Sequence, residues 1–181
     1  MRIHRTLRRK VVCLAASISC ALVTAVHVPV QSNAADQNVI AISGIVTGNV
    51  QGVGFRAMIQ KQAIRYNLSG SAENSNDGSV RFILQGAGER IDQALKAVRE
   101  GTKRSTNVSV SVSPASVDSN LRTFAVVGWT SVGRHISHPY DLIFYLRRDN
   151  AIIKKDEAKA IWLDICRKTV KGRDIGKCDK D

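Results

Sequence analysis

The chain has 181 residues, of which 44% are hydrophobic, and a formal net charge of +12 at pH 7, which suits one ordinary domain with an appendage. Without residues 1–34 the formal net charge is +7, of which +3 belongs to residues 36–131 and +4 to residues 132–181. These cations form no dense stripe interleaved with aromatic residues, so we expect no nucleic-acid partner and instead a solvated surface that weakly attracts anions.

Residues 1–34 are typical of an export signal peptide. A basic start, MRIHRTLRRK, precedes an apolar stretch, VVCLAASISCALVTAV, and a small-residue cleavage site in QSNAAD. We therefore expect an exported protein, either periplasmic or secreted. The alternative is an uncleaved anchor, because the apolar stretch is nearly long enough to cross a bilayer. Only in that case would the protein contact a membrane.

The next segments predict a strand, a helix and two further strands. VIAISGIVTG is β-branched and apolar on both faces, which suits a central buried strand. FRAMIQKQAIRYNL repeats apolar residues along one helical face. SGSAENS is a short polar strand, NDG a turn, and SVRFILQG a strand with alternating apolar residues. The positions expected to face the core are Phe55, Ile59, Ala63, Tyr66, Val80, Phe82 and Leu84.

A second helix and two strands complete the pattern. GERIDQALKAVREG is amphipathic, NVSVSVSP alternates strictly between valine and serine, and LRTFAVVGW is one more strand. The positions expected to face inward are Ile91, Ala94, Leu95, Val98, Val108, Val110 and Val112. The order βαββαβ plus a terminal strand predicts an α+β, ferredoxin-like split βαβ sandwich. Its sheet would be mostly antiparallel, with two helices on one face.

The segment GNVQGVGFR, residues 48–56, joins the first strand to the first helix. Helix N-termini leave N–H groups without intrahelical acceptors and carry partial positive charge. Glycines let the preceding backbone curl so that further N–H groups point into the same hollow, which suits a phosphate. Arg56 adds a planar cation that matches phosphate oxygens. The alternative is a tight turn followed by a solvated arginine.

Nucleotide-binding motifs fit this segment less well. The residues from Gly52 to Ala57 match G-x-G-x-x-A after a strand, but the parallel βαβ series of a dinucleotide fold is missing. A P-loop also fails, because no Gly-Lys-Ser/Thr closes the loop. A small phosphate site on a ferredoxin-like scaffold therefore remains beside the plain turn.

GNVQGVGFR resembles the signature loop of the acylphosphatase family, and LSGSAENSNDGSVRFILQG is similar to the family's second block, in which Asn precedes a D-G-S-V hairpin. The resemblance covers residues 39–130, within a domain expected at 36–131. It implies hydrolysis of acyl phosphates to carboxylate and phosphate, without metal or cofactor. It also implies that Arg56 binds the phosphoryl group and that Asn74 orients the attacking water. The implied backbone phosphate cradle comprises Gln51, Gly52, Val53, Gly54 and Phe55.

The residues are chemically suited to this reaction. An acyl phosphate expels a carboxylate whose conjugate acid has a pKa of about 4, so the leaving group needs no proton. Phosphoryl transfer passes through a loose transition state, in which positioning and charge stabilisation do most of the catalysis. Asn74 can hold a water in line by hydrogen bonding. Its alternative role is that of a turn residue before Asp77 and Gly78.

Four positions depart from the family's usual pattern, namely Asn49, Ser71, Glu73 and Asn76. None of them has an assigned role, although Glu73 adds negative charge beside the expected anion site. The rival interpretation is a non-catalytic, exported module on the same fold. Such a module would capture phosphate or another anion and would use the C-terminal tail as an interaction arm.

Residues 132–181 lie outside the resemblance and predict a partly helical C-terminal extension. DLIFYLRRDNAI is a strand or an edge addition, and KKDEAKAIWLDICRKTVKG is a helix with Gly172 as its stop. Its apolar face consists of Ala158, Ile161, Trp162 and Ile165. We expect this face to dock on the domain or to form a small cap. A protein partner, of unknown identity, is the alternative.

Cys166 and Cys178 are the two cysteines outside the signal segment. In an exported protein such a pair predicts a disulfide. Two unpaired thiols are the alternative, because sequence separation alone does not establish bridging geometry. A metal site would need further ligands, for which His135, His138 and Asp141 are loosely spaced candidates.

Overall fold

The computed structural model describes residues 38–129 and 139–180. The expected export signal, His135 and His138 therefore lie outside the described residues. The strands are β1 (Val39–Asn49), β2 (Ser69–Asn74), β3 (Val80–Ala87), β4 (Thr106–Ala115), β5 (Thr123–Trp129) and β6 (Tyr140–Tyr145). The helices are α1 (Phe55–Tyr66), α2 (Gly88–Glu100) and α3 (Lys155–Thr169), and a 3-10 segment spans Gly172–Lys180.

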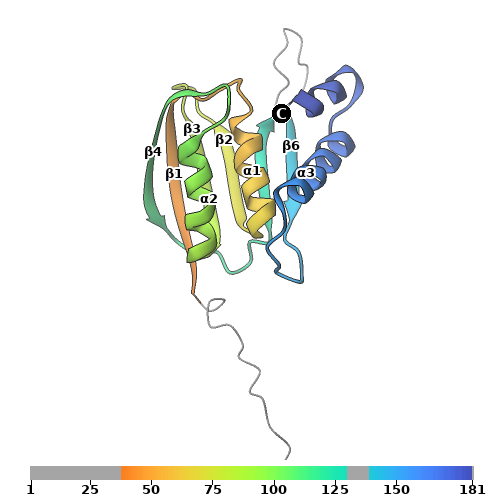
Figure 1. Cartoon of the computed structure of the whole chain (residues 1–181). Helices are drawn as coiled ribbons and strands as arrows, with labels where there is room; N and C mark the ends of the chain where they lie inside the picture. The colour runs from red at the N-terminus through yellow and green to blue at the C-terminus, as the bar shows by residue number, and fades with distance from the viewer. Residues whose placement is uncertain (1–37, 130–138, 181) are drawn as a thin grey trace, which may run out of the picture. The chain divides into compact units, whose positions relative to one another are not determined.

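The strands form one sheet in the order β4-β1-β3-β2-β5-β6 (Figure 1). Neighbouring strands run antiparallel except β2 and β5, which are parallel. The predicted order βαββαβ plus a terminal strand is confirmed, and β6 of the extension adds to the edge beyond β5. The fold is α+β and ferredoxin-like.

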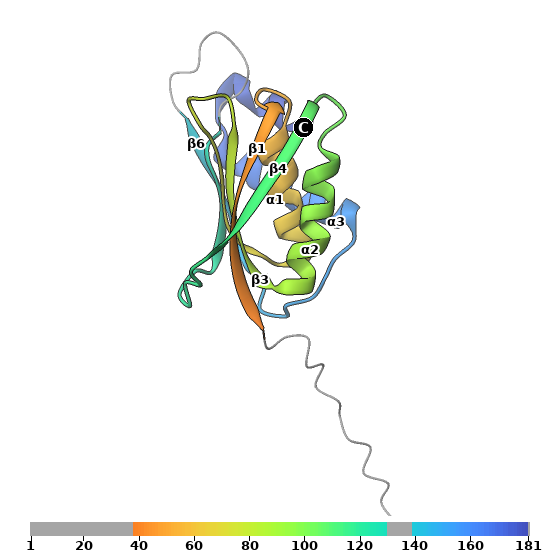
Figure 2. The same ribbon diagram turned by 90° about the vertical axis from the view of Figure 1, so that its left-hand side faces the viewer.

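The helices cover one face of this sheet (Figure 2). Helix α1 lies between α2 and α3 (Figure 1) and contacts both. The core fills the space between the sheet and these helices, and the predicted helical faces lie in it. The buried residues of those two faces are Phe55, Ile59, Ala63, Tyr66, Ile91, Ala94, Leu95 and Val98.

Two burial expectations need correction. Val112 was expected to point inward but is 38% exposed, whereas Val108 and Val110 are partly buried against the core. The reason is that β4 is an edge strand with a neighbour on one side only. The sequence of β1 predicts a buried strand, and β1 does pair on both sides. Ile45, however, is 39% exposed because it lies on the sheet face opposite the helices.

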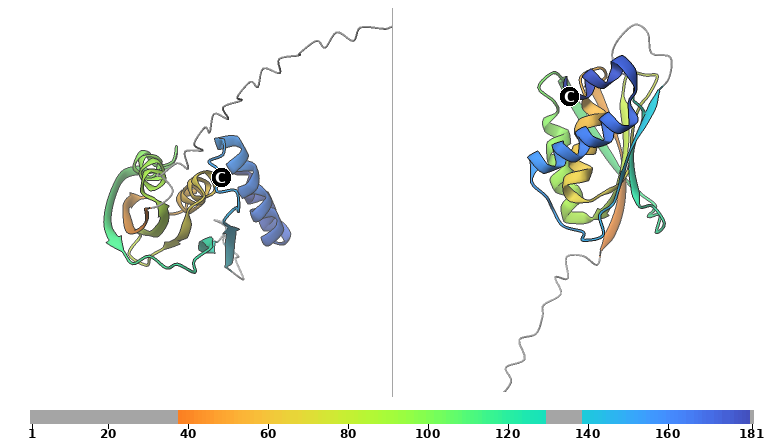
Figure 3. Two further views of the ribbon diagram at one scale, coloured as in Figure 1. Left: turned by 90° about the horizontal axis from the view of Figure 1, so that it is seen from below. Right: turned by 90° about the vertical axis from the view of Figure 1, so that its right-hand side faces the viewer.

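The extension docks on the domain through the apolar face of α3, which confirms the first of the two arrangements predicted for that face. Trp162 is fully buried and Ala158 nearly so, and both belong to the same core as α1. Figure 3 shows α3 running alongside α1. The helix ends at Thr169, earlier than expected, and Gly172 instead begins the 3-10 segment.

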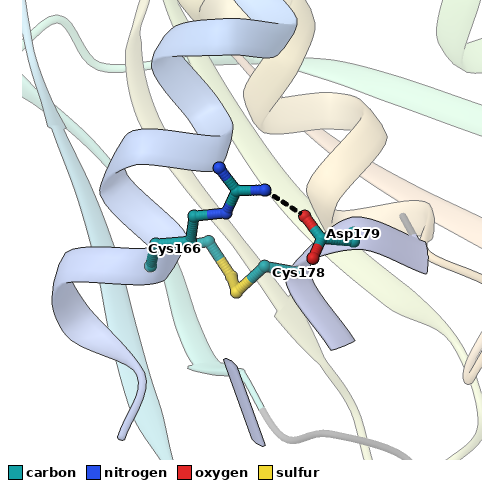
Figure 4. The surroundings of a disulfide bond; sticks show 4 residues. Cys166, Cys178 and Asp179 are labelled. Carbon is teal, nitrogen blue, oxygen red and sulfur yellow. Dashed lines mark hydrogen bonds and ion pairs between the residues drawn. A yellow bond between two sulfur atoms is a disulfide. The ribbon is translucent and has the colours of Figure 1, made fainter. Parts of the chain in front are cut away.

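The 3-10 segment is joined to α3 by a disulfide between Cys166 and Cys178 (Figure 4). Both cysteines are fully buried. Beside them, Arg167 pairs with Asp179 at 2.5 Å. Cys178 and Asp179 are thereby joined to α3. Among the described residues, no helix combines the length and the apolar character needed to cross a bilayer.

Candidate active site

The loop between β1 and α1 takes its shape from glycines in the left-handed region, with φ of 71° at Gly52 and 78° at Gly54. Gly54 caps α1, and its carbonyl accepts the first helical bond, from Met58 N at 2.9 Å. The N–H groups of the residues before Met58 therefore have no acceptor within the helix. The first turn contains no acidic side chain, so the positive end of the helix dipole favours an anion.

Thr102, in the loop after α2, orients one peptide group of this segment. Its Oγ1 donates to the carbonyl of Val53 at 3.2 Å. None of the peptide bonds within residues 38–129 and 139–180 is cis, and in a trans peptide the C=O and N–H point in opposite directions. Holding the Val53 carbonyl therefore turns the N–H of Gly54 away from Thr102.

The side chain of Gln51 joins the glycine loop to the β2–β3 hairpin. Its Nε2 donates to the carbonyls of Ser75 at 2.8 Å and Ser79 at 2.7 Å. Ser75 immediately follows Asn74, the last residue of β2. The loop and the expected water-orienting residue are thus linked by two hydrogen bonds. The sequence prediction used only the backbone of Gln51, and nothing in the sequence pattern indicates this contact.

Strand register brings the ends of β1, β2 and β5 to one end of the sheet (the upper end in Figure 1). Val80 pairs with Val46 of β1 and with Asn74 of β2. In the parallel pair, Ala72 lies beside Val126, so the residues two positions further on, Asn74 and Gly128, leave the sheet at the same end. Since side chains alternate along a strand, Asn74 lies on the helix-covered face with Val80, and its side chain is exposed there.

Arg56, the second residue of α1, reaches the end of β5. Its Nη1 donates to the carbonyls of Val127 at 2.8 Å and Gly128 at 2.9 Å. No sequence pattern around Arg56 indicates these acceptors, which come more than seventy residues later in the chain. The guanidinium is therefore held next to the strand end that neighbours Asn74.

Glu73 was expected to bring a negative charge beside the anion site. Alternation along β2 directs its side chain to the opposite sheet face from that of Asn74. Its cross-strand neighbour there is Arg81 of β3, and opposite charges in such pairs are favourable. The carboxylate is thus placed across the sheet from the glycine loop.

A groove of about 660 Å³ opens on the helix side of the loop and includes Val53 and Gly54 in its wall. Six Lys and Arg residues line this groove against two acidic residues. Lys61, one of the six, lies 4.2 Å from the ring centroid of Trp162, so the extension also shapes this surface. The local excess of positive charge attracts anions towards the loop.

The three loosely spaced candidates for a metal site, which we do not expect, lie only partly within the described residues. His135 and His138 are outside them, while Asp141 accepts a hydrogen bond from Gly128 N at 2.8 Å. Across residues 38–129 and 139–180, no three His, Cys, Asp or Glu side chains gather in a group suited to holding a metal ion.

Comparison with known proteins gives one family and several similar relatives. The Acylphosphatase family model matches residues 42–126. The acylphosphatase of Chlorobaculum tepidum is 39% identical over 83 residues, which are 46% of this chain and 90% of that protein. The acylphosphatase of Bacillus velezensis is 35% identical over 82 residues, which are 45% of this chain and 91% of that protein. The crystal structure of an acylphosphatase from Bacillus subtilis is 31% identical in sequence and has a TM-score of 0.47. The match covers 50% of this chain and 99% of that one.

Proposed function

The chain belongs to the acylphosphatase family, and from this premise we propose that it hydrolyses acyl phosphates to a carboxylate and inorganic phosphate. The observation that carries the proposal is the meeting of three elements at one end of the sheet. These are the glycine loop, the guanidinium of Arg56 and the side chain of Asn74. The proposed reaction uses no metal ion and no cofactor.

In this mechanism the phosphoryl group sits in the hollow of the loop. The N–H groups of Gln51, Gly52, Val53, Gly54 and Phe55 donate to its oxygens, and the start of α1 adds favourable partial charge. Arg56 supplies a full positive charge beside them. Because the carbonyls on β5 hold Nη1 at 2.8 and 2.9 Å, little reorganisation is needed when charge develops on the equatorial oxygens.

Asn74 has the role of orienting water. Its amide cannot act as a strong base, but it can accept from and donate to a water molecule. A water held in line with the breaking P–O bond suffices in a loose transition state, and the proton that this water loses is taken up by the product phosphate. The carboxylate leaves as an anion, since its conjugate acid has a pKa of about 4, and so the mechanism requires no general acid.

The first experiment measures turnover of a synthetic acyl phosphate by the purified full chain in the presence of a chelator. We expect turnover that persists with chelator and falls at least about 10²-fold in Arg56→Gln, the typical cost of removing a charge-stabilising donor. Arg99→Gln is the matched control, because Arg99 also donates through Nη1 to a backbone carbonyl, that of Val110 at 3.3 Å. Equal rates for the two variants would contradict the role of Arg56.

The second experiment separates binding from catalysis. Asn74→Ala should retain affinity for inorganic phosphate while losing most of kcat, and Asn76→Ala, an exposed neighbour in the hairpin turn, should retain both. An unchanged kcat in Asn74→Ala would remove Asn74 from the mechanism. Phosphate binding by the intact chain without any turnover would favour the rival, non-catalytic module.

We further propose that the protein acts outside the cytosol, in the periplasm or as a secreted protein. The signal-like pattern of residues 1–34 supports this, as does the disulfide between Cys166 and Cys178. Cell fractionation with detection of the extension tests the proposal. Recovery of the uncleaved chain only from the cytosolic fraction would contradict it.

A further inference from the structure

Strand β5 contains a bulge where it pairs with β6. Val126 pairs with Leu142 and Trp129 with Tyr140, so two residues of β5 lie opposite the single residue Asp141. Such a two-against-one arrangement defines a β-bulge, which redirects the peptide groups of the longer strand. Here the bulged residues are Val127 and Gly128, and Gly128 has a φ of 59°, a conformation that glycine adopts without steric cost.

The peptide group inside this bulge is hydrogen-bonded at both ends. Its N–H, that of Gly128, donates to Asp141 Oδ1 at 2.8 Å. Its C=O, that of Val127, accepts from Arg56 Nη1 at 2.8 Å. The C=O and N–H of a trans peptide point in opposite directions, so one rigid, planar group connects the carboxylate to the guanidinium.

From this geometry we propose that Asp141 is a positioning residue for Arg56, and that the C-terminal extension thereby completes the phosphate site. The inference rests on the proposed function. An ionised acceptor strengthens the hydrogen bond from the amide N–H, and hydrogen bonds in series polarise one another, which strengthens the bond at the carbonyl end. Asp141 itself does not need to contact the substrate. It fixes the orientation of the carbonyl, and the carbonyl fixes the guanidinium.

A buried side chain links the elements on either side of this connection. Gln60 of α1 is fully buried, and its Nε2 donates to the carbonyls of Phe124 on β5 at 3.3 Å and Leu142 on β6 at 2.6 Å. Arg56 lies on the same helix, four residues earlier. The helix that carries the guanidinium and the strand that carries Asp141 are therefore held together through one buried side chain.

This arrangement depends on the C-terminal extension, for which two similar relatives are too short. The matched residues make up 90% of the Chlorobaculum tepidum protein and 91% of the Bacillus velezensis protein. The remainder of each is too short for a counterpart of residues 132–181. Positioning of Arg56 by a side chain on β6 is thus a property of this chain's extension.

The test compares Asp141→Ala, which removes the acceptor, with Asp141→Asn, which keeps an acceptor oxygen. Asp141→Ala should lower kcat/KM about tenfold, within the roughly 10²-fold that a 1 Å misplacement can cost, and Asp141→Asn should stay within about threefold of the wild type. In an Arg56→Gln background, Asp141→Ala should have no further effect. Asp149→Ala is the control, because Asp149 also accepts a backbone N–H in the extension, that of Ala151 at 3.2 Å.

A second readout does not depend on activity. In ¹⁵N NMR of the full chain, the guanidinium signal of Arg56 should show hindered rotation in the wild type and in Asp141→Asn. In Asp141→Ala it should average with those of exposed arginines, and the Gly128 amide should exchange faster. Asp141→Glu displaces the carboxylate by one methylene, so the Arg56 rotation and the Gly128 exchange rate should lie between those of the wild type and of Asp141→Ala. This variant replaces Asp141→Ala in the comparison if the alanine variant does not fold.

Two results would overturn the inference. One is an unchanged Arg56 signal in Asp141→Ala. The other is an equal loss of kcat/KM whether or not Arg56 is present, which would assign Asp141 a purely structural role. If the wild type shows no turnover, the proposed function fails by itself, and the NMR comparison still decides whether Asp141 positions Arg56.

Discussion

Replacing Gln51 by alanine tests whether the glycine loop and the β2–β3 hairpin work as one unit. The change removes two hydrogen bonds, to the carbonyls of Ser75 and Ser79, each with a net contribution of about 0.5–1.5 kcal/mol. Both carbonyls keep a backbone donor, since Ser75 O accepts from Gly78 N and Ser79 O from Ser75 N. No buried acceptor is therefore left unsatisfied, and we expect a loss of about 1–3 kcal/mol in the free energy of unfolding.

The same change should impair catalysis, because Asn74 is adjacent to Ser75. Urea unfolding and acyl phosphate turnover measured on the same preparations give both quantities, and we expect kcat/KM to fall about tenfold. Gln51→Glu should be worse, since it points a carboxylate at two carbonyl oxygens. Gln93→Ala, on the exposed side of α2, is the control. If Gln51→Ala matches Gln93→Ala in stability and in rate, the loop and hairpin are not coupled in this way.

Three further changes test other parts of the structure. In Gly44→Ala, the new Cβ would lie 2.1 Å from the ring of Phe82, so overpacking should lower the free energy of unfolding by about 1–3 kcal/mol; unchanged urea unfolding would show that the ring shifts without cost. Mass spectrometry of the unreduced protein should find Cys166 and Cys178 bonded, and replacing both by serine should cost about 3 kcal/mol for a loop of this length; two freely alkylated thiols would end that prediction. Hydrogen bonds from the side chain and backbone of the serine two residues later lower the pKa of Asp77 below 3.8, so its contribution to stability should be complete above that value and disappear as the pH falls through the folded-state pKa. Asp77→Ala should abolish this part of the acid dependence, and identical pH profiles for wild type and variant would contradict it.

Local patterns in the sequence were sufficient to predict most of the fold. The i, i+3, i+4, i+7 spacing of Ile91, Ala94, Leu95 and Val98 predicts the buried face of α2 because a helix repeats every 3.6 residues, and all four are buried. The loop of residues 48–56 was identified by its resemblance to the acylphosphatase signature loop, because glycines followed by an arginine are also compatible with a plain tight turn. Exposure of Val112 was not predictable, since alternation within a strand does not reveal whether that strand lies at the sheet edge.

The sequence by itself determined the elements, their order and the side chains that could handle a phosphoryl group, because those depend on periodicity and on residue chemistry. Only the tertiary structure decided what holds those side chains in place. Arg56 finds its carbonyl acceptors on β5, and Gln51 finds its own on the β2–β3 hairpin. Glu73 is directed to the far sheet face by the register of β2. The direction of Glu73 follows from the pairing of β2 with β3, and the acceptors of Arg56 and Gln51 follow from the packing of α1 and the glycine loop against distant segments. No local pattern encodes a hydrogen bond to the backbone of a segment dozens of residues away.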